Sequence, residues 1–114
     1  MAAALAASVL HTACAEQAAS QVSLAQLPVQ ARTTYERIHN GGPFPYDKDG
    51  SIFGNRERLL PAEKRGYYRE YTSKTPRERS RGARRIVCGG WQATRPDACY
   101  YTADHYASFA RITP

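Results

Sequence analysis

Cysteine is scarce in this chain of 114 residues, which contains three, at positions 14, 88 and 99. None of them forms a C-x-x-C pair, and no group of His and Cys residues has the spacing of metal ligands. The sequence therefore argues against a zinc site, and we expect neither a metal nor a cofactor. Internal repeats and low-complexity tracts are also absent.

Long hydrophobic runs are missing as well. The longest apolar stretch, residues 1–10, is far too short to span a membrane as a helix. It ends before Ala13-Cys14-Ala15, an A-x-A pattern of the kind that a signal peptidase cleaves. We therefore expect residues 1–15 to be a signal peptide, 16–21 a linker and 22–114 the folded domain.

This signal is atypical because no Lys or Arg precedes the apolar run. An alanine-rich helix belonging to the domain is one alternative, and a lipid-modified Cys14 is another. We favour the signal peptide, which predicts a secreted protein. A periplasmic location and a lipid anchor at Cys14 are the alternatives.

Cleavage of the signal or modification of Cys14 leaves Cys88 and Cys99 as an even pair. Both lie in segments of β character, which makes a disulfide between neighbouring strands geometrically reasonable. The short loop would limit its stabilisation to roughly 2–3 kcal/mol. Two free buried thiols are the alternative.

Composition predicts one small folded domain with an anionic partner. The chain is 42% hydrophobic and contains eight Tyr, which is enough for a core. Its formal net charge is +6, and residues 64–85 alone carry +7, from nine Lys and Arg and two acids. This basic segment favours nucleic acid or a membrane surface as partner. A solvated basic face is the simpler interpretation.

The pattern along the chain predicts an α+β domain. Ala31, Tyr35 and Ile38 form an apolar stripe with helical spacing, between Pro28 and the stop signal Asn40-Gly41-Gly42-Pro43. Residues 42–50 are rich in turn formers, and short β segments follow at 51–58, 67–73, 83–89, 98–102 and 106–112. We expect one N-terminal helix packed on a twisted antiparallel sheet.

Strand alternation brings possible catalytic groups to one surface. It divides the strand near Glu70 into two faces, with Tyr68, Glu70 and Thr72 on one and Tyr67, Arg69 and Tyr71 on the other. Arg85 and Val87 share a face of the next strand. A Glu, several Arg and His105 suit phosphodiester cleavage, with the carboxylate as base and the imidazolium as acid. Taken singly, each is equally a structural residue, and Glu70 a salt-bridge partner.

A family resemblance runs through most of the chain. The matching stretches are Gly42-Pro43-Phe44-Pro45-Tyr46, Phe53-Gly54-Asn55-Arg56-Glu57, Leu60-Pro61, residues 66–72, Thr75-Pro76, residues 81–89 and residues 100–106. In this order they resemble the microbial guanyl-specific ribonucleases, most closely the ribonuclease Sa branch and more distantly the barnase branch.

The resemblance implies a role for each polar residue of that surface. Glu70 would be the general base on the ribose 2′-hydroxyl, His105 the general acid, and Arg85 and Arg81 the groups that hold the phosphate. Tyr106 would line the phosphate or ribose site, although it equally suits the core. The implied reaction forms a 2′,3′-cyclic phosphate and then hydrolyses it, which requires RNA as the substrate.

The resemblance also implies a guanine-binding loop, formed by Phe53, Gly54, Asn55, Arg56 and Glu57. The Glu57 carboxylate would accept from N1–H and the exocyclic amine of guanine. Phe53 or Arg56 would stack on the base. Gly54 stands where the family has a longer side chain, and a plain β-turn with charged rims is the alternative for this loop.

The sequence departs from the family in several places. Ser23 occupies the first position of the family's terminal disulfide, and no cysteine follows Cys99. Arg69 replaces a histidine and should point away from Glu70. Trp91 lies in a lengthened loop, where we favour an anchoring role over a nucleic-acid contact.

The sequence therefore predicts a monomeric endoribonuclease that cleaves single-stranded RNA after guanosine. The alternative is a non-catalytic, basic RNA-binding or toxin-like module with the same fold, which would have no reason to keep Glu70, Arg81, Arg85 and His105 together. The family also implies a possible partner, a small acidic inhibitor of the barstar kind.

Overall fold

The computed structural model describes residues 20–114, so the expected signal peptide and most of the expected linker lie outside the described part. The elements are β1 (Gln21–Ser23), the 3-10 helix η1 (Leu24–Gln26), α2 (Val29–Asn40), β2 (Ser51–Ile52), β3 (Tyr68–Thr72), β4 (Arg85–Gly89), β5 (Ala98–Thr102) and β6 (Ala110–Thr113). No helix within residues 20–114 is long and apolar enough to cross a membrane.

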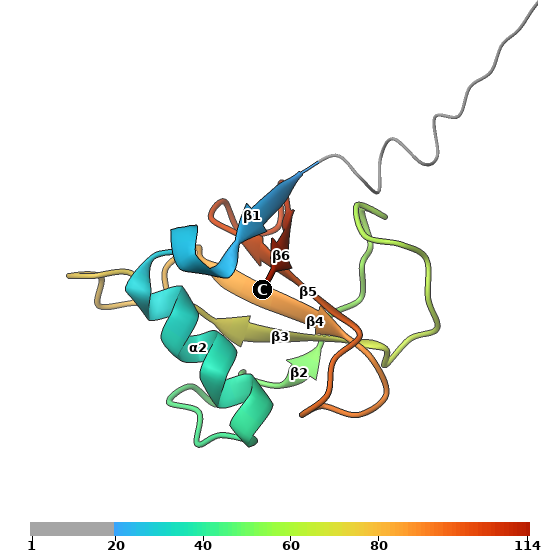
Figure 1. Cartoon of the computed structure of the whole chain (residues 1–114), viewed down its shortest axis with the longest axis horizontal. Helices are drawn as coiled ribbons and strands as arrows, with labels where there is room; N and C mark the ends of the chain where they lie inside the picture. The colour runs from blue at the N-terminus through green and yellow to red at the C-terminus, as the bar shows by residue number, and fades with distance from the viewer. Residues whose placement is uncertain (1–19) are drawn as a thin grey trace, which may run out of the picture.

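The strands form one six-stranded sheet in the order β1-β6-β5-β4-β3-β2 (Figure 1). Neighbouring strands are antiparallel except β1 and β6, which run parallel. The expected α+β class is confirmed. The parallel edge strand was not predicted because three residues are too few to display a periodic pattern.

Helix α2 covers one face of the sheet, as expected (Figure 1). It follows Pro28 and ends at Gly41, whose φ of 83° is the left-handed conformation that suits glycine. Ala31 and Ile38 are buried, and they belong to one apolar cluster with Tyr71 and Ile86 of the sheet. The stripe predicted from sequence is therefore the packing face of the helix.

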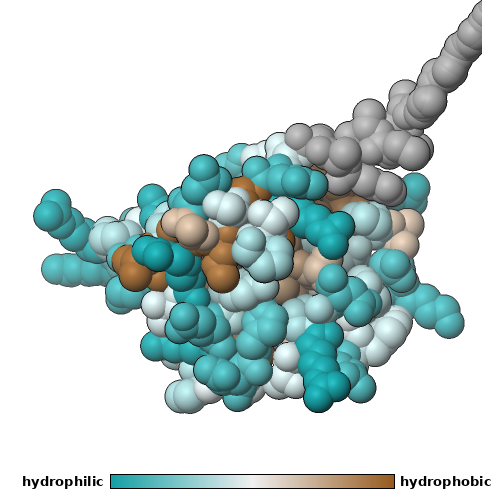
Figure 2. Space-filling view, in the orientation of Figure 1, coloured by the Kyte–Doolittle hydropathy of each residue, from teal (hydrophilic) through white to brown (hydrophobic). Residues whose placement is uncertain are grey.

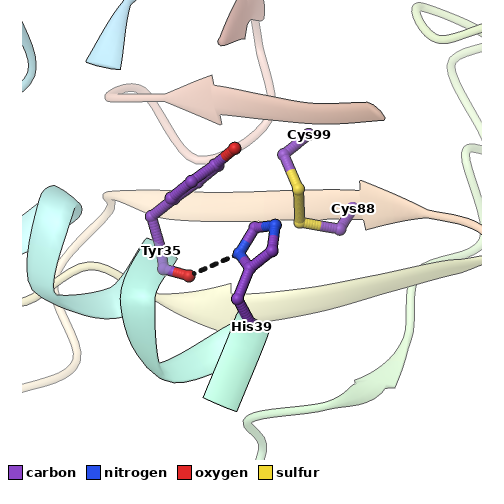
Figure 3. The surroundings of a disulfide bond; sticks show 4 residues. All are labelled: Tyr35, His39, Cys88 and Cys99. Atoms are coloured by element: carbon purple, nitrogen blue, oxygen red, sulfur yellow. Dashed lines mark hydrogen bonds between the residues drawn. A yellow bond between two sulfur atoms is a disulfide. The ribbon is translucent and has the colours of Figure 1, made fainter. Parts of the chain in front are cut away.

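The predicted disulfide between Cys88 and Cys99 is present, with an S–S distance of 2.05 Å. The two residues are direct partners in the register of β4 and β5, and both are buried on the helix side of the sheet. The neighbouring rings of Tyr35 and His39 on α2, tilted by 41° to each other, lie in its surroundings (Figure 3). The cross-link therefore joins the central strands beneath the helix.

Four of the expected strands are shorter than predicted, and one of them is β3, which covers Tyr68–Thr72 instead of 67–73. Only Ser51–Ile52 of segment 51–58 is strand, because Asn55 and Arg58 adopt positive φ angles of 53° and 58°. β4 begins at Arg85 rather than at residue 83. The last strand begins at Ala110 rather than at residue 106.

Tyr67 also differs from expectation, because it lies outside β3 and does not face the helix side of the sheet. The turn before it contains Gly66 with a φ of 98°, and Tyr67 packs instead with the second apolar cluster. That cluster has Leu60, Tyr68 and Val87 at its centre. It supports the sheet face opposite α2.

Candidate active site

Glu70 lies in the middle of β3, on the face opposite helix α2. It is the register partner of Val87, and Thr72 is the partner of Arg85, so the expected meeting of carboxylate and guanidinium is observed. Glu70 Oε1 accepts a hydrogen bond from Arg81 Nη2 and lies 3.9 Å from Arg85 Nε. The carboxylate therefore lies between two arginines.

Arg85 is almost completely buried, with 3% of its side chain exposed. Its Nη1 donates to the carbonyl oxygens of Gly82 at 3.0 Å and Arg84 at 2.8 Å, which fixes the guanidinium plane. Its Nε is buried and has no hydrogen-bond partner among residues 20–114. A buried, positively charged donor without a partner costs free energy, and a bound anion would satisfy it.

Arg81 reaches Glu70 from the loop between β3 and β4. Its Nε donates to Thr72 Oγ1 at 2.9 Å while Nη2 contacts the carboxylate. Its side chain is 24% exposed, against 3% for Arg85. Arg81 is therefore the solvent-facing member of the arginine pair.

His105 is exposed beside this cluster, in a turn with a φ of 56°. Its backbone N–H donates to Ala83 O at 2.9 Å, and its ring centroid is 4.8 Å from that of Tyr106. A left-handed φ is unusual for His and needs support from its surroundings.

Asp104 supplies that support. It accepts hydrogen bonds from the Thr102 hydroxyl at 2.8 Å, the Ser108 N–H at 2.9 Å and the Ser108 hydroxyl at 2.6 Å. The bonds from Ser108 and then Thr102 lower the pKa of Asp104 to about 2. Sequence reasoning overlooked Asp104, although its place directly before His105 was a usable signal.

Tyr106 links the two sides of the site. Its hydroxyl donates to Glu70 Oε2 at 2.9 Å, and Arg85 Cζ lies 5.9 Å from the centroid of its ring. Burial and then the hydrogen bond to Glu70 raise the pKa of Tyr106 to about 12. The phenol therefore remains a neutral donor to the carboxylate.

A cavity of about 430 Å³ opens beside the cluster. Its lining comes from the predicted guanine loop and from the segment after β5: Phe53, Gly54, Asn55, Arg56, Glu57, Leu59, His105, Tyr106, Ala107 and Phe109. The rings of Phe53 and Tyr106 are 4.9 Å apart and form its aromatic wall. Sequence reasoning missed Leu59 and Phe109, because single apolar residues in loops carry no distinguishing pattern.

Within the guanine loop, the side chain of Asn55 forms hydrogen bonds with the backbone. Its amide donates to Leu60 O at 3.0 Å, and its Oδ1 accepts from Leu60 N–H at 3.1 Å. Glu57 and Arg56 are exposed at the rim. Asn55 thus shapes the loop, while the two charged side chains remain available to a ligand.

No group of three or more His, Cys, Asp or Glu residues suited to a metal ion occurs within residues 20–114. Arg69 points away from the cluster, as expected, and its Nη1 donates to Gly50 O at 2.8 Å. Arg81 and Arg85 are the cations that lie beside the Glu70 carboxylate.

Comparison with known proteins identifies the family. The ribonuclease family model matches residues 11–113. Guanyl-specific ribonuclease Sa of Kitasatospora aureofaciens is 52% identical over 91 residues, which cover 80% of this chain and 91% of that protein. The chain belongs to the microbial guanyl-specific ribonucleases.

Two further comparisons agree with this assignment. Guanyl-specific ribonuclease Sa3 of the same organism is 54% identical over 97 residues, which cover 84% of this chain and 65% of that protein, slightly less than two thirds of its length. A crystal structure of ribonuclease Sa2 with guanosine-2′-cyclophosphate superposes with a TM-score of 0.74 at 43% identity, covering 83% of this chain and 96% of that one. This chain therefore has the same fold as ribonuclease Sa2, whose structure contains a bound guanosine nucleotide.

Proposed function

We propose that this protein is an endoribonuclease that cleaves single-stranded RNA on the 3′ side of guanosine. The observation that carries the proposal is the arrangement of Glu70 between Arg81 and Arg85, beside a cavity lined by residues 53–57 and His105. One wall of this arrangement suits a purine base, and the other suits the phosphate that follows it. Its relatives bear the name guanyl-specific ribonuclease.

In the first step Glu70 removes the proton from the ribose 2′-hydroxyl. The 2′-oxygen attacks the adjacent phosphorus, the bond to the 5′-oxygen of the next nucleotide breaks, and His105 protonates that oxygen. The product is a 2′,3′-cyclic phosphate. In the second step the roles reverse: His105 activates water, Glu70 returns a proton to the 2′-oxygen, and a 3′-phosphate results.

The arginines supply the charge that stabilises the transition state. Arg85 Nε, which has no hydrogen-bond partner among residues 20–114, is a donor available to a non-bridging phosphate oxygen. Arg81 reaches the same region from the solvent side, and Tyr106 holds Glu70 through its neutral hydroxyl. DNA would be spared because it lacks the 2′-hydroxyl.

Guanine would be selected by the loop at 53–57. Glu57, which lines the cavity, would accept from N1–H and the exocyclic amine, a donor pair that adenine lacks. Phe53 and Arg56 offer planes for stacking. The Asn55 bonds to Leu60 keep the loop in a fixed shape before the base arrives.

Secretion is part of the proposal. Residues 1–15 would be the signal peptide, 16–21 the linker and 22–114 the domain that acts outside the cell. The disulfide between Cys88 and Cys99 supports this location, because disulfides persist in oxidising compartments. The basic face around Arg81 and Arg85 also suits a small acidic inhibitor of the barstar kind, and we expect the free enzyme to be a monomer.

The test is digestion of a short RNA with a single guanosine, in EDTA. We expect cleavage 3′ of that guanosine with a transient 2′,3′-cyclic phosphate. Glu70→Gln and His105→Ala should each lower kcat by roughly 100- to 10,000-fold. Glu36→Gln, on the exposed side of α2, is the control and should retain wild-type activity. Wild-type protein that binds the RNA and leaves it intact would favour the non-catalytic alternative.

A further inference from the structure

Trp91 is exposed, although we expected it to anchor its loop. It follows β4, its exposed fraction is 65%, and its ring packs against the edge of Tyr67 with centroids 5.5 Å apart. Tyr67 in turn packs at 90° against Tyr68, with centroids 5.0 Å apart, and its hydroxyl donates to Asp97 Oδ2 at 2.7 Å. The anchoring part of the expectation is observed, but most of the indole surface stays open to solvent.

This aromatic stack lies on the same face of the sheet as Glu70. Gly89 and Val87 share a face of β4, and Val87 is the register partner of Glu70. A Cβ atom at Gly89 would lie 2.4 Å from Tyr67 Cε2, so Tyr67 lies directly across this glycine. Trp91 therefore extends the Glu70 face at the end of β4 remote from Arg85.

Arg65 connects the stack to the guanine loop. Its Nη1 lies 3.6 Å from the position of a Cβ on Gly54, in the loop that lines the cavity. The next residue, Gly66, would place a Cβ 3.7 Å from Trp91 Cζ3. Arg65 therefore reaches the guanine loop with its guanidinium, while the residue that follows it lies beside the indole.

We propose that Trp91 and Arg65 form a subsite for the nucleotide on the 5′ side of the guanosine. The base of that nucleotide stacks on Trp91, and Arg65 contacts the phosphate that joins it to the guanosine. The subsite tolerates any base, because every base presents a π-face. This proposal rests on the proposed function, since it assumes that guanosine occupies the cavity.

The direction of the RNA follows from the ends of the β3–β4 pair. Arg81, Arg85 and His105 gather where β3 ends and β4 begins, so the scissile phosphate and the nucleotide 3′ of it lie there. Trp91 lies at the opposite end, about 7 Å or more along β4 from the register position of Glu70. That separation is on the scale of one nucleotide, which leaves this end for the 5′ side.

The local charges favour a nucleic acid over an apolar protein segment. Lys64 and Arg65 are exposed just before Gly66 in the chain, and Arg95 is exposed in the loop that follows Trp91. The acids near Tyr67 are Glu63 and Asp97. The Asp97 carboxylate accepts from the Tyr67 hydroxyl, which holds it at the edge of the stack. A flat aromatic surface with flexible cations beside it matches the way in which single strands are bound.

Trp91 is the only tryptophan in the sequence, so its fluorescence reports on this subsite alone. We would titrate the wild-type protein with oligonucleotides that carry a 2′-deoxyguanosine and therefore resist cleavage. The first oligonucleotide is a dinucleotide, with one nucleotide on the 3′ side of the guanosine. The second is this dinucleotide extended by two nucleotides at its 5′ end. The third is the same dinucleotide extended by two nucleotides at its 3′ end. Quenching by the second but not by the first or third is expected. Equal quenching by the second and third, or no quenching by any, would overturn the proposal.

Kinetics provide the independent test. Trp91→Ala and Arg65→Gln should each lower kcat/KM about five- to tenfold for an RNA substrate with two nucleotides on the 5′ side of the guanosine. For the ribodinucleotide without this 5′ extension, kcat/KM should stay at the wild-type value. Trp91→Phe should retain most of the activity, and Val29→Ala, which trims an exposed apolar side chain on α2, is the matched control. Equal losses on both substrates would indicate a structural role and contradict the proposal. If the wild type cleaves neither substrate, the proposed function fails, whereas fluorescence still reports whether the subsite binds RNA.

Discussion

At the residue scale, the site depends on two consecutive residues in the left-handed region. His105 and Tyr106 have φ angles of 56° and 75°, values that non-glycine residues rarely adopt. Tyr106 N–H donates to Thr102 Oγ1 at 3.1 Å, and Asp104 accepts the three bonds that close the turn. The conformation that carries the proposed acid is therefore imposed by short polar side chains.

Replacing Asp104 should disturb both activity and stability. Asp104→Asn loses the charged acceptor, so His105 should be held less accurately, and we expect kcat/KM to fall roughly ten- to hundredfold. Because the folded-state pKa of about 2 lies below the ordinary value of 3.8, the carboxylate contributes stability above pH 3.8. That contribution is lost as the pH falls toward 2.

Urea denaturation of wild type and Asp104→Asn between pH 2 and 7 checks the second effect. The wild type should be the more stable protein at pH 5–7, and the difference should shrink between about pH 4 and pH 2. Asp47→Asn, an exposed acid in the loop after α2, serves as the control. A difference independent of pH would show that the Asp104 charge is not responsible.

At the element scale, the pairing of β3 and β4 determines which side chains meet. The five-residue register places Thr72 opposite Arg85 and Glu70 opposite Val87. Period-2 alternation was sufficient to predict this face for Glu70 and Arg85. The same alternation assigned Tyr67 to the wrong face. β3 begins only at Tyr68, and Tyr67 still belongs to the turn that contains Gly66.

Any side chain at Gly89, at the end of β4, should destabilise the fold. In Gly89→Ala the added methyl would lie 2.4 Å from Tyr67 and 2.8 Å from Tyr68, so the aromatic stack must move. We expect a loss of about 1–3 kcal/mol in the free energy of unfolding, as for other overpacked sites.

Urea denaturation provides this measurement, with Gly54→Ala as the matched control. A methyl at Gly54 meets its nearest atom at 3.6 Å, which is an ordinary contact. Its effect should stay within about 0.5 kcal/mol. Equal stabilities of the two variants would contradict the packing described for Tyr67.

At the scale of the whole molecule, much of the excess positive charge lies in one projecting loop, residues 73–84, which contains five Lys and Arg and one Glu. The segment between β3 and β4 extends past the helix in Figure 1, and hydrophilic side chains project there in Figure 2. Lys74, Arg77 and Arg79 are exposed and form no ion pair within residues 20–114. The acid of this loop, Glu78, accepts from Ser80 N–H and hydroxyl instead. The loop is therefore well suited to attract RNA.

Cleavage of long RNA should consequently depend on salt through this loop. Arg77→Gln combined with Arg79→Gln should reduce the slope of log kcat/KM against log salt by about 1 to 2, since each phosphate contact contributes about 0.7. Arg32→Gln with Arg37→Gln on α2 is the matched control. The measurement is the rate on polymeric RNA from 50 to 200 mM salt. Identical slopes for the two double variants would exclude a special role for the loop.

The sequence by itself determined the fold class, helix α2, the disulfide and most of the charged residues of the site. These follow from local signals: an apolar stripe bounded by Pro28 and Gly41, alternation along short strands, and motifs shared with a family. Such signals are visible because each depends on residues close together in the chain.

Tertiary structure decided what depends on long-range contacts. Three such contacts join distant segments: the parallel pairing of β1 with β6, the hydrogen bond from the Tyr106 hydroxyl to Glu70, and the packing of Trp91 beside the Glu70 face. The fold also leaves Arg85 Nε buried without a hydrogen-bond partner among residues 20–114. No local pattern encodes such a contact, because its energy depends on side chains that the fold alone brings together.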